Sequence, residues 1–200
     1  MGYCIDRSIV FVGMMGVGKT AVGRAVAGRL GVRFADSDNE LERASGMTIP
    51  EIFSERGEQV FRDLETRVIE SLLMGEPIVL SVGGGAFVSD ANRRNIMQRG
   101  FSVWIDADPD TIWDRVQRKG GRPLLEVDDP YSELKQLYRM RRPIYAKADV
   151  SVRSRNDRSV DDMAAAVVRM LVETVGSGVS LGRDNERIHQ VDRKTCVPPE

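Results

Sequence analysis

The segment GMMGVGKT, residues 13–20, directly follows the apolar run of residues 9–12 and fits the pattern G-x-x-x-x-G-K-T. In a loop of this kind successive backbone N–H groups point inward and form an anion site, which the dipole of the following helix reinforces. The pattern predicts that Lys19 reaches the β- and γ-phosphates of a nucleotide and that the hydroxyl of Thr20 binds Mg²⁺. The other nucleotide contacts are expected from Gly16, Val17, Gly18 and Ala21.

A pair of carboxylates follows a second apolar run. In the stretch FADSDNE, Asp36 and Asp38 are two residues apart on an extended segment, so both side chains point to the same side. Doubly wound sheets bind ligands at the carboxyl ends of their strands, where this pair is expected. One carboxylate can hold Mg²⁺ through water, while the other accepts or orients the proton of a substrate hydroxyl. The alternative is that the pair caps a helix in solvent.

Three consecutive glycines follow another buried run. In VLSVGGG, the residues Gly83, Gly84 and Gly85 leave space where side chains would obstruct a ligand, which suggests backbone contact with a small molecule. An ordinary turn is the alternative. GTPase switch proteins carry D-x-x-G at this site, but the aligned residue is Ser81, and an N-K-x-D motif is absent. The switch-protein interpretation is therefore disfavoured.

Arginines recur at Arg62, Arg122, Arg141 and Arg142. Guanidinium groups bind carboxylates and phosphates through two parallel hydrogen bonds, which suits an anionic acceptor and a phosphoryl group in transfer. Each arginine taken alone is equally compatible with a solvent-exposed role. Their combination with the carboxylates and the glycines predicts an acceptor site.

The elements that must position these residues follow an alternating pattern. Short apolar runs alternate with segments of helical period, which is typical of βαβ units around a buried parallel sheet. We therefore predict an α/β fold with three layers, α/β/α, and a five-stranded parallel sheet. The expected strands are residues 8–12, 33–36, 78–82, 101–106 and 149–152. The helical faces expected to pack on the sheet are Val22, Ala25, Val26 and Leu30, and Val60, Leu64, Val68 and Leu72.

Helix boundaries are marked by caps and glycines. Residues 48–51 form a capping-box pattern, and a further helix is expected from Gly57. The Asp-Pro pair at 108–109 opens a helix to about Lys119, after which a glycine pair predicts a mobile surface loop. Helices are expected over residues 131–146 and 160–175. The apolar period then vanishes, so residues 176–200 are predicted to be a disordered tail.

Composition limits the remaining possibilities. The 200 residues are 42% hydrophobic, which fits one domain over residues 1–175. With 29 basic and 30 acidic residues the net charge is −1, so no overall field favours nucleic acid or an anionic membrane. No apolar run approaches the ~20 residues that cross a bilayer. Two distant cysteines suit a reducing compartment, and a cytoplasmic location is expected.

From about Ile9 to Leu171 the sequence resembles the shikimate kinase family, P-loop NTPases of the nucleoside monophosphate kinase-like fold group. The resemblance is carried by GMMGVGKT, DSD, IFSERGEQVFRDLE, LSVGGGA, RPLL and RRPIY. It implies the ATP-dependent phosphorylation of the 3-hydroxyl of shikimate, a carboxylated cyclohexene triol on the route to aromatic amino acids. It also implies a mobile lid at about residues 118–130, a substrate-binding segment at about residues 36–66, and a monomer.

The resemblance assigns roles to individual residues. It implies that Asp38 binds the substrate hydroxyls and acts as base or orienter, while Asp36 reaches Mg²⁺ through water. The expected carboxylate clamp is Arg62 and Arg141, with Glu65 bracing Arg62. Gly83, Gly84 and Gly85 are expected to line the substrate floor. In the lid, Arg122 would cover the γ-phosphate and Arg118 would stack on adenine.

Two departures and two alternatives remain. Only three residues separate Arg118 from Arg122, so the residue that stacks on adenine stays open, and Ser81 replaces an acidic residue of the usual second nucleotide motif. The nearest alternative function is a related kinase for gluconate or another small hydroxy acid. The alternative from a different functional class is a nucleotide-binding regulator that has kept the fold but has lost catalytic turnover.

Overall fold

The computed structural model describes residues 2–117, 127–176 and 189–191. At its centre lies a five-stranded parallel sheet of order β3-β4-β2-β5-β6. The strands are β2 (Ser8–Val12), β3 (Phe34–Asp36), β4 (Val79–Ser81), β5 (Gly100–Asp106) and β6 (Val150–Arg153). All five strands predicted from the sequence are confirmed, with ends that differ by at most one residue.

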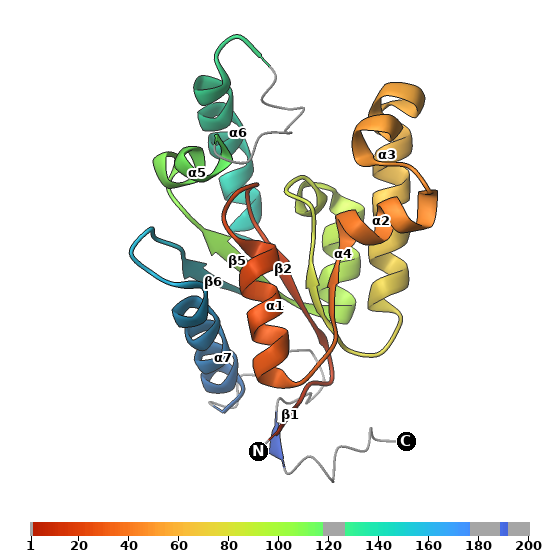
Figure 1. The fold of residues 1–200 in the computed structure, drawn as a ribbon. Helices are drawn as coiled ribbons and strands as arrows, with labels where there is room; N and C mark the ends of the chain where they lie inside the picture. Colours follow the sequence, from red (N-terminus) through yellow and green to blue (C-terminus); the bar gives the residue numbers. More distant parts are fainter. Residues whose placement is uncertain (1, 118–126, 177–188, 192–200) are drawn as a thin grey trace.

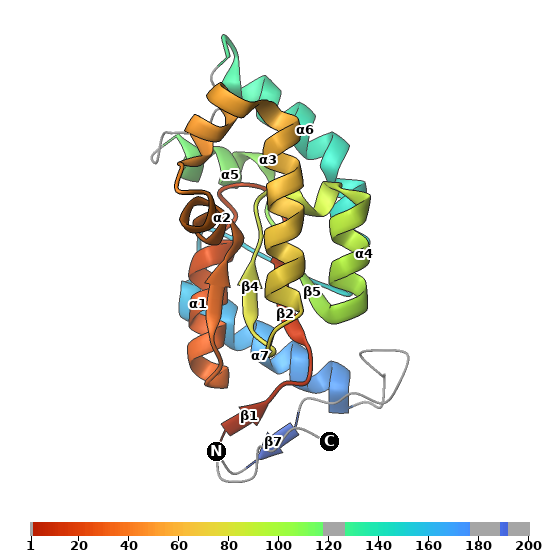
Figure 2. The same cartoon turned by 90° about the vertical axis from the view of Figure 1, so that its right-hand side faces the viewer.

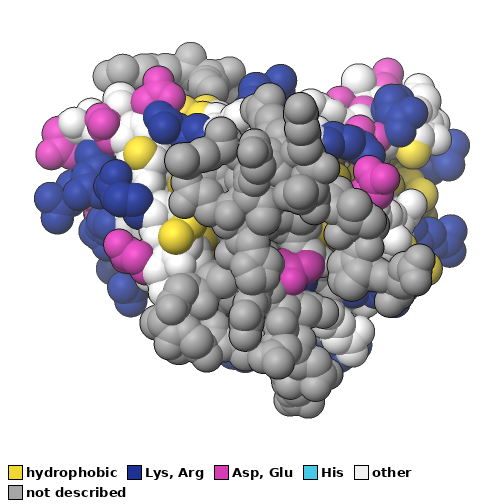
Figure 3. Space-filling model, turned by 90° about the horizontal axis from the view of Figure 1, so that it is seen from below, with side chains coloured by type: hydrophobic (Ala, Val, Ile, Leu, Met, Phe, Trp, Pro, Cys, Tyr) yellow, Lys and Arg dark blue, Asp and Glu magenta, His cyan; other side chains and the backbone are white. Residues whose placement is uncertain are grey.

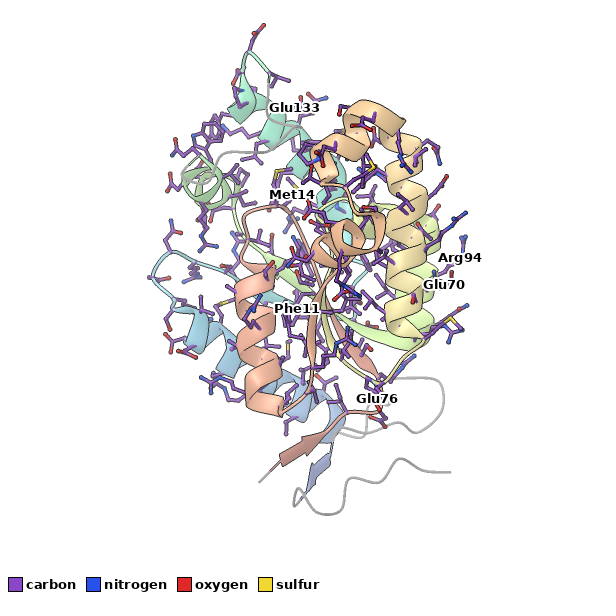
Figure 4. The ribbon with its side chains drawn as sticks, turned by 45° about the vertical axis from the view of Figure 1, so that its right-hand side comes forward. Phe11, Met14, Glu70, Glu76, Arg94 and Glu133 are labelled. Atoms are coloured by element: carbon purple, nitrogen blue, oxygen red, sulfur yellow. The ribbon has the colours of Figure 1, made fainter. Side chains whose placement is uncertain are left out.

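Helices cover both faces of this sheet. Helices α1 (Lys19–Leu30) and α7 (Val160–Gly176) lie together on one face, whereas α3 (Ile49–Leu73) and α4 (Asp90–Arg99) lie on the other (Figures 1 and 2). Every residue of β2 and β5 is buried, as expected for the central strands of a parallel sheet that is covered twice. In Figure 4, Phe11 lies within this layered core. The three-layer α/β/α prediction is confirmed.

The predicted helix starts are confirmed by their caps. The Thr48 side chain accepts the Glu51 N–H while the Glu51 carboxylate accepts the Thr48 N–H, which is a complete capping box at the start of α3. The expected break at Gly57 is present as a non-helical residue with φ 81° and ψ 168°. Helix α5 (Pro109–Val116) begins at the Asp108 cap but ends before the expected Lys119, which lies outside the described residues. The further helices are α2 (Ser37–Ser45), η1 (Ala86–Val88) and α6 (Pro130–Tyr145).

The buried stripe of α3 differs from the predicted one. The residues that face the core in the second half of the helix are Phe61, Glu65, Ile69 and Leu73. The expected row of Val60, Leu64, Val68 and Leu72 is displaced by one position, and Val60 is 37% exposed. Leu64, Val68 and Leu72 are partly buried and pack against the core, so the prediction holds in part. Its register is one position off because a glutamate interrupts the fully buried stripe, and an apolar pattern excludes a buried charged residue. That glutamate belongs to the functional site.

The two ends of the chain meet at the lower edge of the molecule. Strand β1 (Gly2–Cys4) pairs antiparallel with β7 (His189–Val191), and the pair lies below the sheet and away from the loop after β2 (Figures 1 and 2). The prediction of a tail without structure was wrong for residues 189–191. Backbone pairing with β1 supplies the partner, and this short segment has no side-chain pattern that announces it. Residues 177–188 and 192–200 lie outside the described part of the chain.

The described surface carries mixed charge. Seen from below in Figure 3, basic and acidic side chains are interspersed around the rim of the face. Within residues 2–117, 127–176 and 189–191, none of the helices is both long and apolar enough to span a bilayer.

Candidate functional site

The site lies at the carboxyl ends of β2, β3 and β4, which are neighbouring strands in the sheet. A cavity of about 530 Å³ opens there. Such an edge is the usual place for a ligand in an open parallel sheet. The cavity is lined, among others, by Gly16, Val17, Gly18, Lys19, Thr20, Ala21, Asp36, Asp38, Gly83 and Gly84. Most of the residues predicted from three separate sequence motifs therefore meet at one opening.

Residues 13–20, which we call the phosphate loop, need glycine for backbone reasons. Gly13, Gly16 and Gly18 have φ values of 134°, 77° and 99°, a region that other residues rarely adopt. A Cβ at Gly16 would also stand 2.6 Å from Val116 Cγ2, and one at Gly13 would stand 2.6 Å from the Ile105 carbonyl oxygen. The loop is thus moulded against β5 and α5.

Lys19 is the first residue of α1, and its side chain is folded over the loop. Its Nζ donates to the carbonyl oxygens of Gly13 and Met14, each at 2.9 Å, and the residue is 8% exposed. Figure 4 shows Met14 in the loop that follows β2, the strand that holds Phe11. The ammonium group is therefore held at the loop.

Thr20 and Asp36 form a small oxygen cluster beside Lys19. Thr20 Oγ1 donates to Asp36 Oδ2 at 2.8 Å and lies 3.4 Å from Ser81 Oγ. The other Asp36 oxygen accepts the Asp38 N–H at 3.1 Å, which caps α2. A hydroxyl beside a carboxylate is a donor set that suits Mg²⁺, which commonly takes one or two protein ligands and completes its shell with water and phosphate. The described residues hold no cluster of three or more acidic, His or Cys groups able to bind a metal.

Residues 83–85, which we call the acceptor floor, need glycine for space. A Cβ at Gly83 would lie 2.8 Å from Asp38 Oδ1 and 2.9 Å from Glu65 Oε1. A Cβ at Gly85 would lie 2.8 Å from Arg62 Nη1. Charged side chains of α2 and α3 thus occupy the volume that side chains at 83 and 85 would take.

Glu65 is the buried carboxylate at the centre of this group. It is 2% exposed and accepts a hydrogen bond from Arg62 Nη1 at 3.1 Å, as the sequence predicted. The outer Nη2 of Arg62 pairs with the exposed Glu58 at 3.1 Å. Burial raises the pKa of Glu65, and Asp38 raises it further, whereas Arg62 and Arg141 act in the opposite direction.

Arg141 comes to the same group from α6. Its Nη1 is buried and has no hydrogen-bond partner. A buried guanidinium nitrogen without a partner is costly, so a site that keeps one is prepared for an anion. Arg62 and Arg141 do not line the cavity itself. Arg62 binds Glu65, which lies with Asp38 beside Gly83 in the cavity wall.

The structure brings Arg115 to the cavity, and the sequence analysis missed it. Arg115 Nη1 donates to the Val17 carbonyl at 3.2 Å and to Ser154 Oγ at 3.0 Å, and Nη2 donates to the Arg155 carbonyl at 3.2 Å. Beyond Arg115 the wall continues through Ser154, Arg158, Ser159, Val160 and Met163. An isolated arginine on a short helix gives no motif, and only its carbonyl partners reveal its place. The predicted lid residues Arg118 and Arg122 lie outside the described part of the chain.

The fold and the site together define a P-loop kinase of the nucleoside monophosphate kinase-like group. A family model described as shikimate kinase matches residues 15–172. The shikimate kinase of Ruegeria pomeroyi is 53% identical over 84% of this chain and 86% of its own. Among solved structures, the shikimate kinase of Acinetobacter baumannii in complex with shikimate is 38% identical, with a TM-score of 0.80 over 84% of this chain and 94% of that one.

The chain belongs to the shikimate kinase family. A gluconokinase from Sinorhizobium meliloti superposes with a TM-score of 0.54 over 88% of this chain and 99% of that one, but it is only 18% identical. That likeness shows the fold alone.

Proposed function

We propose that this protein transfers the γ-phosphoryl group of ATP to the 3-hydroxyl of shikimate, giving shikimate 3-phosphate for aromatic amino acid biosynthesis. The observation that carries the proposal is the contact between the two halves of the site. A Cβ at Gly84 would lie only 3.1 Å from Met15 N, so the acceptor floor lies directly against the phosphate loop. An acceptor on the floor is therefore next to a nucleotide in the loop.

The donor half binds the phosphates. The inward N–H groups of the phosphate loop and the dipole of α1 attract the phosphate oxygens. Lys19 exchanges its two carbonyl partners for phosphate oxygens and stabilises the charge that develops on the transferred group. Thr20 and Asp36 would hold Mg²⁺, which neutralises phosphate charge and aligns the donor.

The acceptor half binds the hydroxyls and the carboxylate. Asp38 accepts or orients the proton of the attacking hydroxyl, which general base catalysis requires. Arg62 and the unsatisfied nitrogen of Arg141 bind the substrate carboxylate, and Glu65 holds Arg62 in place. Because both halves are fixed before reaction, the main contribution is orientation plus electrostatic stabilisation.

The lid roles stay predictions from the sequence pattern. We propose that Arg122 covers the γ-phosphate and that Arg118 reaches the adenine. Arg115 lines the cavity and donates to the Val17 carbonyl, so it is a second candidate, beside Arg118, for the contact with adenine.

The experiment is a coupled ADP-release assay with three classes of acceptor: shikimate, gluconate and nucleoside monophosphates. We expect turnover with shikimate alone. Activity only with gluconate would assign the chain to a hydroxy acid kinase instead. ATP binding without turnover on saturating shikimate would identify a regulator that has lost catalysis.

We further propose that the enzyme acts as a monomer in the cytoplasm. Sedimentation at assay concentration measures the oligomeric state. A specific activity, expressed per mole of chain, that rises with protein concentration would contradict the monomer.

A further inference from the structure

The backbone of the acceptor floor is held partly by side chains. Within the segment, the Gly83 and Gly85 carbonyls accept the N–H groups of Ala86 and Val88, each at 3.0 Å. Two further bonds run outside it. The Gly83 N–H donates to Ser37 Oγ at 3.2 Å, and the Gly84 carbonyl accepts the hydroxyl of Tyr145.

Ser37 ties the floor to the carboxylates. It is 1% exposed and is the first residue of α2, between Asp36, which caps that helix, and Asp38. Any movement of Gly83 relative to Ser37 therefore also moves the floor relative to both carboxylates.

Tyr145 ties the floor to the arginine of α6. It is 1% exposed, it ends α6, and it follows Arg141 by one helical turn. Its ring is stacked near Trp104, with centroids 6.2 Å apart, and its hydroxyl lies 3.8 Å from Met14 Sδ in the phosphate loop. Burial raises the pKa of Tyr145 to about 12, so the phenol keeps the proton that it donates.

We propose that Ser37 and Tyr145 are positioning residues for the acceptor. By holding one short segment from two different helices, α2 and α6 (Figure 1), they fix the distance between Asp38 and Arg141, and hence between the substrate hydroxyl and carboxylate subsites. Neither side chain is required to touch the substrate. This inference rests on the proposed function, since it names what sets the spacing of that same site.

The test uses Ser37→Ala and Tyr145→Phe in the full chain, singly and together. Each removes one hydroxyl and leaves a buried backbone group without its partner. We expect each single variant to raise the KM for shikimate about five- to tenfold while the KM for ATP changes by less than about twofold. Because both residues act on one segment, the double variant should raise the KM by less than the product of the two single effects.

Matched controls separate positioning from general stability. Ser8 is 2% exposed and its Oγ accepts the Ile78 N–H at 3.2 Å, which is the same kind of bond at the far end of the sheet. Tyr138 lies on α6 and donates to Asp106 at 3.4 Å. Ser8→Ala and Tyr138→Phe should lower the melting temperature comparably while leaving the KM for shikimate within about twofold.

The outcomes are distinguishable. Wild-type turnover on shikimate together with an unchanged KM in both test variants would overturn the inference and leave the proposed function intact. An equal rise in the KM for shikimate in the two control variants would show that the effect comes from lost stability, and it would also overturn the inference. Lack of wild-type turnover on shikimate would overturn the proposed function itself. If Ser37→Ala does not fold, Tyr145→Phe decides alone, because it removes a single oxygen atom.

Discussion

The phosphate loop and the acceptor floor are both rich in glycine, but glycine serves different needs in the two. In the phosphate loop the backbone N–H groups are the binding groups that the sequence pattern predicts. Three glycines adopt the positive φ values that let the backbone turn these groups inward. In the acceptor floor, where no positive φ occurs, the glycines make room for Asp38, Glu65 and Arg62. Under the proposed function, the phosphates, which many proteins bind, are held by backbone groups, while the particular acceptor is held by side chains.

The largest expected effect tests the acceptor side at its reacting group. We predict that Asp38→Asn lowers kcat by about 10²–10⁴-fold, because the amide cannot accept the hydroxyl proton. ATP affinity, measured by calorimetry, should stay close to the wild-type value, since the carboxylate adjoins the floor. An unchanged kcat would remove Asp38 from the mechanism.

The next effect tests the carboxylate clamp. Arg62→Ala should raise the KM for shikimate by about 10- to 100-fold, the cost of losing charged hydrogen bonds, with a much smaller rise for ATP. Arg67→Ala is the matched control, because this arginine is exposed on the same helix. Equal rises for both substrates would argue against a clamp.

A pair of glycine substitutions tests the comparison directly. Gly16→Ala meets both a positive φ and Val116, so it should destabilise the fold and raise the KM for ATP severalfold. The Cβ of Gly85→Ala would contact only the guanidinium end of the flexible Arg62 side chain. This variant should therefore leave stability nearly unchanged and raise the KM for shikimate instead. Kinetics and thermal melts of the two variants provide the check. Effects on the same substrate would break the distinction between the two kinds of glycine.

A smaller effect concerns the pH dependence of stability. Because the pKa of Glu65 is raised in the folded state, the folded protein holds a proton that the unfolded chain releases near pH ~4.3. The wild type therefore loses stability from this group as pH rises from there through the raised pKa. Glu65→Gln lacks that loss, so its unfolding free energy relative to wild type should increase across this window in urea titrations. Parallel pH curves would contradict the prediction.

The smallest effect concerns the end of the chain away from both regions. Removing residues 177–200 should leave kcat and both KM values within about twofold and lower stability by ~1 kcal/mol or less, since the described structure that is lost is the short β1–β7 ladder. Removing residues 192–200, which keeps β7, is the control. A large loss of activity on either truncation would give the tail a role in the site.

The features that were predictable are those written locally in the chain. The five strands, the capping box at Thr48 and the break at Gly57 follow from neighbouring residues, and so does the phosphate loop. The meeting of Asp38 with Gly83 was expected because parallel strands end at a common edge.

Other features depend on tertiary partners and escaped prediction. The contact of Glu65 with Arg62 was expected from the resemblance, but the burial of this glutamate in the core-facing stripe of α3 was not. The contacts of Arg115 and Tyr145 are with backbone carbonyls, and carbonyls carry no residue identity in a sequence. Strand β7 pairs with β1 through its backbone, and backbone pairing leaves no residue pattern in a sequence.

The packing of α5 against the phosphate loop makes the two thermodynamically linked. Val116 would meet any side chain at position 16, and Arg115 binds the Val17 carbonyl, so a nucleotide bound as proposed would contact the same loop as the helix. Linkage is reciprocal: whatever factor a shift of α5 imposes on nucleotide affinity, the nucleotide imposes on the position of α5. Because α5 directly precedes residues 118–130, we expect nucleotide binding at the loop to change the position from which the predicted lid starts.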